Sequence, residues 1–388
     1  MRKLLVLTLF LLSAVTLKAQ STESLRITHG PWLQNVTKDG ATVFFTTNLP
    51  AVPGVLLTGR GALPDTLIRN STDGMIDAGG TLHKVRISGL EPGKSYSYKV
   101  NPVEILKLKP YQIYFGDTIT SKEYKFTTQN NIIKTTRFLV VNDIHTNGKR
   151  LSQHLNSGIA ASQDLVFYNG DMLDVFEDED QLLNVIIDTS VRCFAATVPF
   201  VYIRGNHETR GILSRKLKGY LDYPQDRYYY SFDQGPVHFI VLDCGEDKPD
   251  NNRYYYGLAD YDRYRFTELE WLKEEVRSEA FRNATYRIYL IHMPVHAGDG
   301  SSHSLLFLSD NFGPVIKEAG GDLMIAAHTH RHLWLPEKLS GLGMPLLING
   351  NLNRIEAEAG EQGLKIKVLS ETNEVVTEKE IIKKGRTG

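Results

Sequence analysis

Five apolar stretches of the sequence end in side chains that can bind a metal ion or transfer a proton. Each stretch has the pattern of a buried β-strand, and polar residues follow at once. These residues are Asp143 and His145, Asp171 and Asp174, Asn206 and His207, His292, and His328 and His330. Sites in α/β sheets form beyond the carboxyl ends of the strands, so five such ends can converge on one place.

The residue types indicate what that place could do. Carboxylate, imidazole and amide ligands together suit borderline metals such as Zn, Fe or Mn. A central aspartate can bridge two ions about 3.5–4 Å apart, the spacing of two-metal phosphoesterase sites. Such a pair lowers the pKa of bound water, so that hydroxide is available near neutral pH, and it neutralises phosphate oxygens.

Each motif taken alone has an ordinary structural explanation. Asp143 and Asp171 could cap a helix or a turn. His292 could be a histidine satisfied in the core. His328 and His330 alternate, so on a regular strand they would point the same way as a partly buried polar pair. The joint pattern is much harder to produce by accident, and we therefore interpret it as one site.

The elements that must position these residues alternate strands with helices. Apolar runs predict strands over 137–142, 164–168, 199–204, 237–243, 286–291 and 322–327, with further strands over 345–382. Helices are predicted over 149–162, 178–196 and 268–276. The last helix would start with a capping box made by Thr267 and Glu270. This alternation predicts an α/β domain over residues 134–388.

Residues 21–130 predict a different kind of domain. Strand-like runs with turn residues between them occur at 41–47, 82–87, 96–100, 111–114 and 124–128. Tyr96 could brace the corner before its strand. No helix is evident, so we predict a β-sandwich. It has no cluster of likely metal ligands, and we expect it to be a spacer or docking domain.

Residues 1–20 have the pattern of a secretory signal peptide, with Arg2 and Lys3 before an apolar core. That core is short for a bilayer span, which takes about 20 apolar residues. No later stretch is apolar enough to span a membrane, so we expect an exported protein, periplasmic or secreted. The net charge of −1 and the lack of a long basic run give no signal for nucleic acid or an anionic membrane.

The chain has two cysteines, Cys193 and Cys244. Export would permit a disulfide between them. Both lie in or beside apolar runs, which favours two buried free thiols. Neither belongs to a Cys-x-x-Cys or Cys/His pattern, so we predict no catalytic role for them.

The site motifs, with Gly170 before Asp171 and Gly205 and Glu208 around Asn206-His207, resemble the calcineurin-like metallophosphoesterase family over roughly residues 137–335. The resemblance implies an α/β four-layer fold, with two packed β-sheets flanked by helices. It implies a first metal site of Asp143, His145, Asp171 and His330, and a second of Asp171, Asn206, His292 and His328. His207 would face the substrate, and Asp174 would pair with His207.

The segments GPWLQNVTKDGATVFF and GLEPGKSYSYKV resemble the fibronectin-III-like domain that precedes the catalytic domain in purple acid phosphatases. Those enzymes have glycine where this chain has His145. They also have a metal-bound tyrosine where it has Asp174. A purple iron–tyrosinate centre is therefore not expected here.

Together these features predict an exported phosphoesterase with two metal ions, Mn, Zn or Fe. Hydroxide bound to the metals would attack phosphorus, and His207 would assist the leaving group. Gly205 would let the chain turn tightly before Asn206, and the loop 297–303 would border the substrate pocket. The substrate could be a small-molecule or protein phosphate ester: a monoester, a diester, a nucleotide or a phosphoprotein.

Two other classes remain as alternatives. One is a non-catalytic binding protein on a phosphatase scaffold that engages a partner through its β-domain. The presence of all the expected ligands argues against it, and the absence of bound metal after reconstitution would favour it. The other is a metal-dependent amidohydrolase. Amidohydrolase sites usually open with His-x-His on the first strand, whereas here Asp-x-His comes first and His-x-His last.

Overall fold

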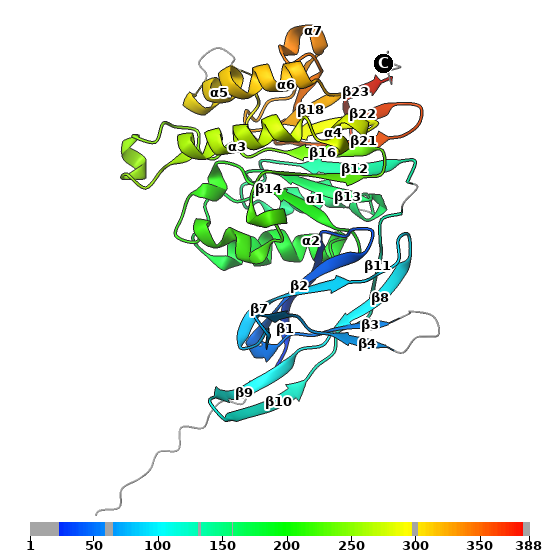
Figure 1. Ribbon diagram of the computed structural model, residues 1–388, viewed down its shortest axis with the longest axis vertical. Helices are drawn as coiled ribbons and strands as arrows, with labels where there is room; N and C mark the ends of the chain where they lie inside the picture. Colours follow the sequence, from blue (N-terminus) through cyan, green and yellow to red (C-terminus); the bar gives the residue numbers. More distant parts are fainter. Residues whose placement is uncertain (1–22, 59–64, 131–132, 157, 297–301, 383–388) are drawn as a thin grey trace, which may run out of the picture.

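The computed structural model describes residues 23–58, 65–130, 133–156, 158–296 and 302–382. The predicted signal peptide and most of the loop 297–303 lie outside this part of the chain. Figure 1 shows two regions stacked along the long axis. Strands β1 to β11 form an all-β region at one end, and the elements from β12 onward form an α/β region at the other.

The β-region consists mainly of two antiparallel sheets. The first contains β1 (Ile27–Gln34), β2 (Gly40–Val52), β7 (Gly80–Ser88), β9 (Val103–Lys109) and β10 (Gln112–Thr118). The second contains β3 (Val55–Thr58), β4 (Thr66–Ile68), β8 (Ser95–Val100) and β11 (Tyr124–Thr127). A small ribbon of β5 (Ser71–Thr72) and β6 (Met75–Ile76) lies apart from them.

Apolar side chains of both sheets form one core, as the alternating sequence predicts. In β8, Tyr96, Tyr98 and Val100 are buried while the residues between them are half-buried. The Tyr96 hydroxyl accepts a hydrogen bond from the Glu91 amide at 2.8 Å. The predicted tyrosine brace is therefore present.

The α/β region contains two mixed six-stranded sheets. The order of the first is β14 (Phe200–Ile203), β13 (Leu165–Asn169), β12 (Thr136–Val141), β21 (Asn353–Ala359), β22 (Leu364–Ser370) and β23 (Val375–Ile381). The order of the second is β15 (Tyr230–Gln234), β16 (Val237–Val241), β17 (Tyr286–Leu290), β18 (Leu323–Ala326), β20 (Leu346–Ile348) and β19 (Leu333–Leu335). Strands β12, β13 and β14 run parallel, as do β16, β17, β18 and β20.

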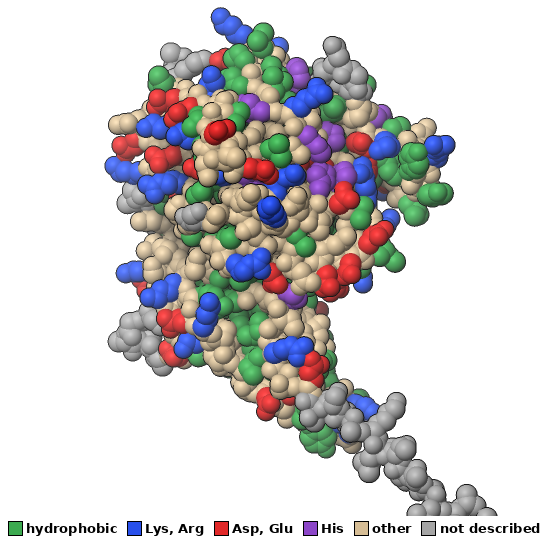
Figure 2. Space-filling view, turned by 180° about the vertical axis from the view of Figure 1, so that it is seen from behind, with side chains coloured by type: hydrophobic (Ala, Val, Ile, Leu, Met, Phe, Trp, Pro, Cys, Tyr) green, Lys and Arg blue, Asp and Glu red, His purple; other side chains and the backbone are tan. Residues whose placement is uncertain are grey.

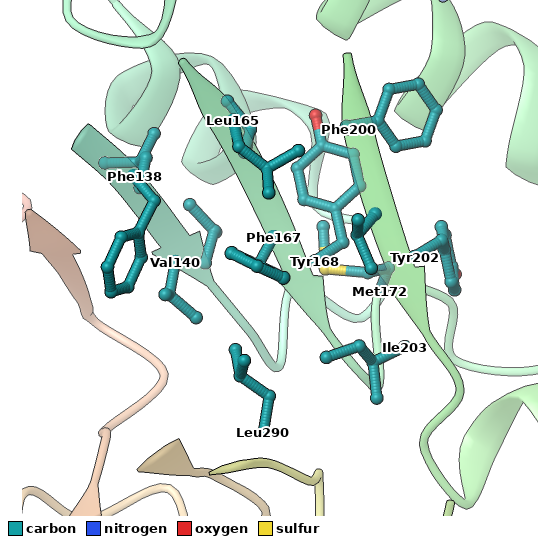
Figure 3. Packing of buried hydrophobic residues seen from close by; sticks show 14 of the residues in the cluster. Phe138, Val140, Leu165, Phe167, Tyr168, Met172, Phe200, Tyr202, Ile203 and Leu290 are labelled. Carbon is teal, nitrogen blue, oxygen red and sulfur yellow. The ribbon is translucent and has the colours of Figure 1, made fainter. Parts of the chain in front are cut away.

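Both faces of the central strands are buried, which explains their continuous apolar sequences. In β17, Ile288 and Leu290 belong to the core between the two sheets, whereas Tyr289 belongs to the core under the outer helices. Figure 3 shows Leu290 facing side chains of β12, β13 and β14, among them Phe167 and Ile203.

Helices cover the outer faces of both sheets, so the predicted four-layer fold is confirmed (Figure 1). On the first sheet lie α1 (Gly148–Leu155) and α2 (Asp188–Cys193), which continues a π-helical segment (Gln181–Ile187). On the second lie α3 (Tyr261–Glu275), α4 (Glu279–Asn283), α5 (His303–Phe307), α6 (Gly313–Ala319) and α7 (Glu337–Ser340). The helix predicted over 149–162 is shorter than expected, because α1 ends at Leu155.

The predicted capping box at Thr267 is wrong. Helix α3 begins at Tyr261, and the Thr267 hydroxyl donates to the Arg263 carbonyl within the helix at 3.1 Å. The carboxylate of Asp250 instead accepts hydrogen bonds from the first amides, those of Tyr261 at 2.8 Å and Asp262 at 3.0 Å. The cap comes from a residue outside the local pattern that a capping box requires.

The β-region and the α/β region share buried surface. Trp32 of β1 and Phe44 of β2 stack at 5.4 Å and belong to the core of the α/β region. The Tyr98 hydroxyl donates to the Ala196 carbonyl at 2.8 Å. Deleting the β-region would therefore uncover apolar surface of the α/β region.

Two further predictions can be compared with the structure. Both cysteines are free thiols; Cys244 is buried and Cys193 half-buried. Within the described ranges, no helix is long and apolar enough to cross a bilayer.

Candidate metal centre

Loops at the carboxyl ends of β12, β13, β14, β17 and β18 meet at one edge of the sheets. Their backbones are joined by hydrogen bonds. The Asp143 amide donates to the Gly170 carbonyl at 3.0 Å, and the His145 amide donates to the Asp171 carbonyl at 3.0 Å. Figure 2 shows histidine side chains gathered on one face of this region. The sequence-predicted residues thus come together at the strand ends, as parallel strands require.

One cluster contains Asp143, His145 and His330. Oδ1 of Asp143 lies 3.2 Å from Nε2 of His330 and 3.8 Å from Nε2 of His145. The two Nε2 atoms are 3.1 Å apart. Asp143 is buried, His145 is half-buried and His330 is exposed. Three ligand atoms so close together could hold one ion at a site that opens to solvent.

A second cluster contains Asp171, His292 and His328. Oδ2 of Asp171 lies 3.0 Å from Nε2 of His292. Nδ1 of His292 donates to the Asn169 carbonyl at 2.8 Å, so Nε2 is the ring nitrogen that faces Asp171 and could bind a metal with it. Asp171 also groups with His145 and His207, so its carboxylate lies between the two clusters.

Several buried polar atoms of these clusters have no hydrogen-bond partner among the described residues. They include Asp143 Oδ1, with His330 Nε2 at 3.2 Å, and His292 Nε2, with Asp171 Oδ2 at 3.0 Å; Asn206 Oδ1 on the neighbouring loop also makes no hydrogen bond. Leaving such an atom unpaired costs about 1–3 kcal/mol. Carboxylate, amide and imidazole atoms are also the ligands that borderline metals accept. The residues present therefore fit metal ions as the missing partners.

The backbone of these loops adopts a conformation that L-residues rarely adopt. The φ angle is positive at Asp143 (51°), His145 (49°), Thr146 (58°), Asp171 (51°), His328 (69°) and His330 (57°). Such strain persists only where the surrounding structure enforces it, and it gathers at functional sites. Because β18 ends at Ala326, the two histidines after it do not share a strand, and they join different clusters.

Glycine is required at two positions beside the clusters. A Cβ atom on Gly205 would lie 2.2 Å from Asp171 Oδ1, and one on Gly170 would lie 2.4 Å from His292 Nδ1. Only Gly170 has a positive φ, of 81°. Gly205 is therefore required for close packing, a role that the predicted tight turn did not include.

Glu208 is a site residue to which the sequence assigned no role. It is fully buried, and its carboxylate accepts hydrogen bonds from the amides of Asp171, Met172, Leu173 and Gly205 at 2.8–3.0 Å. The Tyr202 hydroxyl donates to it at 2.9 Å. Glu208 therefore holds the Asp171 loop against the Asn206 loop. Its only sequence signal is its place next to His207.

Charges and burial move the pKa values of the two histidines of the second cluster in opposite directions. Burial, together with the neighbouring His292, lowers the pKa of His328 to about 4. Burial would also lower the pKa of His292, but Asp171 and Asp143 raise it to about 10. A metal binds neutral imidazole, so binding would displace a proton from His292 but not from His328.

His207 lies on the more open side of Asp171. Its amide donates to Asp171 Oδ1 at 2.9 Å, and its Nε2 lies 3.9 Å from Oδ2. Nδ1 donates to the backbone carbonyl of Asp174 at 2.6 Å and lies 3.4 Å from the Asp174 carboxylate. Nε2 can then accept from Arg210, whose Nη1 is 3.0 Å away. Asp174 does contact His207 as predicted, but chiefly through its main chain.

With the fold and site described, residues 136–332 match the family model of the calcineurin-like phosphoesterases. This match spans half of the chain. The chain therefore belongs to the calcineurin-like phosphoesterase family and is a metal-dependent phosphoesterase. The amidohydrolase alternative is not supported. No curated protein matches the sequence.

Two solved structures share the fold. A purple acid phosphatase from yellow lupin (Lupinus luteus) seeds is 16% identical, with a TM-score of 0.66, covering 91% of this chain and 74% of the other. The structure of PhoD is 12% identical, with a TM-score of 0.59, covering 91% and 92%. Both similarities extend beyond the α/β region into the β-region, because each covers most of this chain.

Proposed function

We propose that the protein is an exported phosphoesterase that hydrolyses phosphate esters at a centre of two metal ions. The observation that carries this proposal is the position of Asp171. Its carboxylate groups with His292 and His328 on one side and with His145 and His207 on the other. Buried atoms without a hydrogen bond, Asp143 Oδ1, Asn206 Oδ1 and His292 Nε2, belong to the same strand-end loops.

Two ligand sets follow from this arrangement. Asp143, His145, Asp171 and His330 would hold the first ion, and Asp171, Asn206, His292 and His328 would hold the second. Ions bound there would activate water as a nucleophile and neutralise charge on the phosphoryl oxygens. Mn, Zn and Fe all suit this ligand set.

A side chain of the protein would supply the proton that the leaving group needs. Hydrolysis joins a water oxygen to phosphorus and breaks the bond from phosphorus to the leaving oxygen, which takes up a proton. In its protonated form His207 could give the Nε2 proton to the leaving oxygen, because the Asp174 carbonyl fixes its Nδ1; Nε2 would first exchange the hydrogen bond from Arg210 for that proton. The Arg210 guanidinium, 3.0 Å from Nε2, adds positive charge beside it.

The test is an assay of mono- and diesters with the metal-stripped protein and with protein reconstituted with Mn, Zn or Fe. We expect hydrolysis only after reconstitution. If metal binds at none of these residues, or binds without hydrolysis of any ester, the non-catalytic alternative is favoured instead. Export rests on the predicted signal peptide, and the N-terminal sequence of mature protein recovered outside the cytoplasm tests it.

A further inference from the structure

A pocket of about 460 Å³ is lined by Arg210, a residue that contacts His207. Two segments line it. One follows the Asn206-His207 loop and includes Arg210 and Arg215. The other precedes α3 and includes Glu246, Tyr254 and Tyr256. Neither segment supplies a ligand of the candidate metal centre, so the pocket is a separate feature.

Arg210 connects the pocket to the site. Its Nη1 lies 3.0 Å from His207 Nε2, while its Nε donates to the buried carboxylate of Glu246. Glu246 also accepts a hydrogen bond from the Tyr255 hydroxyl at 2.7 Å. The wall between pocket and site is therefore held in place by hydrogen bonds. The Arg210 side chain thus borders both His207 and the pocket.

The rim of the pocket exposes large apolar side chains. Tyr254 is 61% exposed, Tyr256 87% and Leu258 75%. Ile212, next to the lining residue Gly211, is 80% exposed. Figure 2 shows an apolar lobe projecting beside the histidines. Clustered exposed apolar residues in a soluble protein usually mark a binding site, because single ones are common but groups are not.

The pocket also contains an arginine, Arg215, with no acidic partner among the described residues. Arg215 is exposed and forms no ion pair with any acidic side chain in the described part of the chain. Lys248, by contrast, pairs with Asp247 at 2.5 Å. An arginine of this kind can bind a carboxylate or phosphate, or lie against an aromatic ring.

We propose that this pocket binds the leaving group of the substrate and selects an aromatic one. The ring would lie against Tyr254 and Tyr256, and a negatively charged substituent on the ring would contact Arg215. This rests on the proposed function, since it assigns the leaving-group side of that same site. It is independent of which metals are bound.

The test compares benzyl phosphate with ethyl phosphate in the metal-reconstituted full chain. The two leaving alcohols have similar acidity, so a difference in kcat/KM reports on the ring. We expect benzyl phosphate to be preferred by about 10- to 100-fold, the range that an apolar pocket typically gives. In the double variant Tyr254→Ala/Tyr256→Ala the preference should fall below about threefold, with most of the loss on the benzyl ester.

Two further variants separate the effect of the pocket tyrosines from that of any exposed tyrosine and test the role of Arg215. Tyr111→Ala removes a still more exposed tyrosine in the turn between β9 and β10, in the β-region, and should leave the preference unchanged. For 4-carboxybenzyl phosphate, we expect a further gain of about tenfold over benzyl phosphate, which Arg215→Ala should abolish.

Equal kcat/KM for benzyl and ethyl phosphate, or a preference that survives Tyr254→Ala/Tyr256→Ala, would overturn the assignment. If the pocket instead binds a protein partner, the double variant Tyr254→Ala/Tyr256→Ala would leave the preference unchanged. Failure of the proposed function looks different, because no ester would then be hydrolysed by any of the proteins.

Discussion

Asp143 and Asp243 both follow a buried strand, and in the sequence they look alike. Both are fully buried. Yet Asp243 is paired on both carboxylate oxygens with Arg204, whose guanidinium lies 3.9 Å from the centre of the Tyr228 ring. Asp143 Oδ1 makes no hydrogen bond, and the ionisable groups near it are imidazoles, those of His330 at 3.2 Å and His145 at 3.8 Å. Burial alone therefore does not mark a functional carboxylate; what distinguishes Asp143 is that imidazoles, which can also bind a metal, stand where Asp243 has a permanently charged guanidinium.

The surroundings of the two aspartates support the same distinction. The Asp243 amide donates to the buried carboxylate of Glu268 at 2.8 Å, and Asp243 itself has no positive φ angle. Burial and the nearby Asp243 raise the pKa of Glu268. The loops of Asp143 and Asp171 instead have positive φ angles. We interpret the Arg204–Asp243 pair as structural and the Asp143–Asp171 group as built for metal.

The largest expected effect comes from Asp171→Asn. The amide has no charge to share between two ions, so we expect loss of metal and a fall in kcat of about 10⁴-fold or more. The fold should persist, since a buried negative charge is removed. Metal analysis and circular dichroism of the purified variant measure both. If two metals and a near-normal rate remain, Asp171 does not bridge.

The next effect is that of His207→Ala. It should leave the metal content intact and lower kcat by about 10²–10⁴-fold, the usual contribution of a positioned general acid. The loss should shrink for nitrophenyl esters, whose leaving groups need no proton. Equal losses on good and poor leaving groups, or loss of metal, would count against the role of His207.

Asp243→Asn should lower the stability of the fold and leave metal binding unchanged. Leaving Arg204 buried without its partner should lower the free energy of unfolding by about 3–5 kcal/mol, whereas the double change Arg204→Met/Asp243→Leu should cost less. Urea unfolding of both variants gives the values. The metal content of the folded fraction should match that of the wild type. A loss of metal would show that Asp243, too, supports metal binding and is not a purely structural residue.

The smallest effect is expected from Asp174→Asn. The main-chain carbonyl that holds His207 is kept, and the Asp174 carboxylate is 65% exposed, so solvent screens it. We expect kcat to fall by less than about threefold. A loss as large as that of His207→Ala would mean that the carboxylate, and not the carbonyl, positions the imidazole.

These contrasts also explain what the sequence could predict. Asp143, Asp171, Asn206, His292 and His328 could be found because parallel strands bring their carboxyl ends to one edge, so position along the chain implies position in space. The two-sheet fold followed from the same alternation of strands and helices. Local patterns of apolar and polar residues carried both predictions.

The features that the sequence did not predict depend on contacts between residues far apart in the chain, which no local pattern encodes. The start of α3 is fixed by Asp250, eleven residues before Tyr261. Glu208 acts through amides of a loop on another strand, and Arg210 through Glu246, 36 residues away. The positive φ angles at the ligands follow from the crowding of several loops, which only the folded chain contains.

The central claim is that these strand ends hold two metal ions on either side of Asp171. Anomalous diffraction from a crystal of the Mn- or Zn-reconstituted protein, collected at the absorption edge of that metal, tests it most directly. We predict two peaks about 3.5–4 Å apart, one beside Asp143, His145 and His330 and the other beside Asn206, His292 and His328. A single peak, or peaks away from Asp171, would contradict the account.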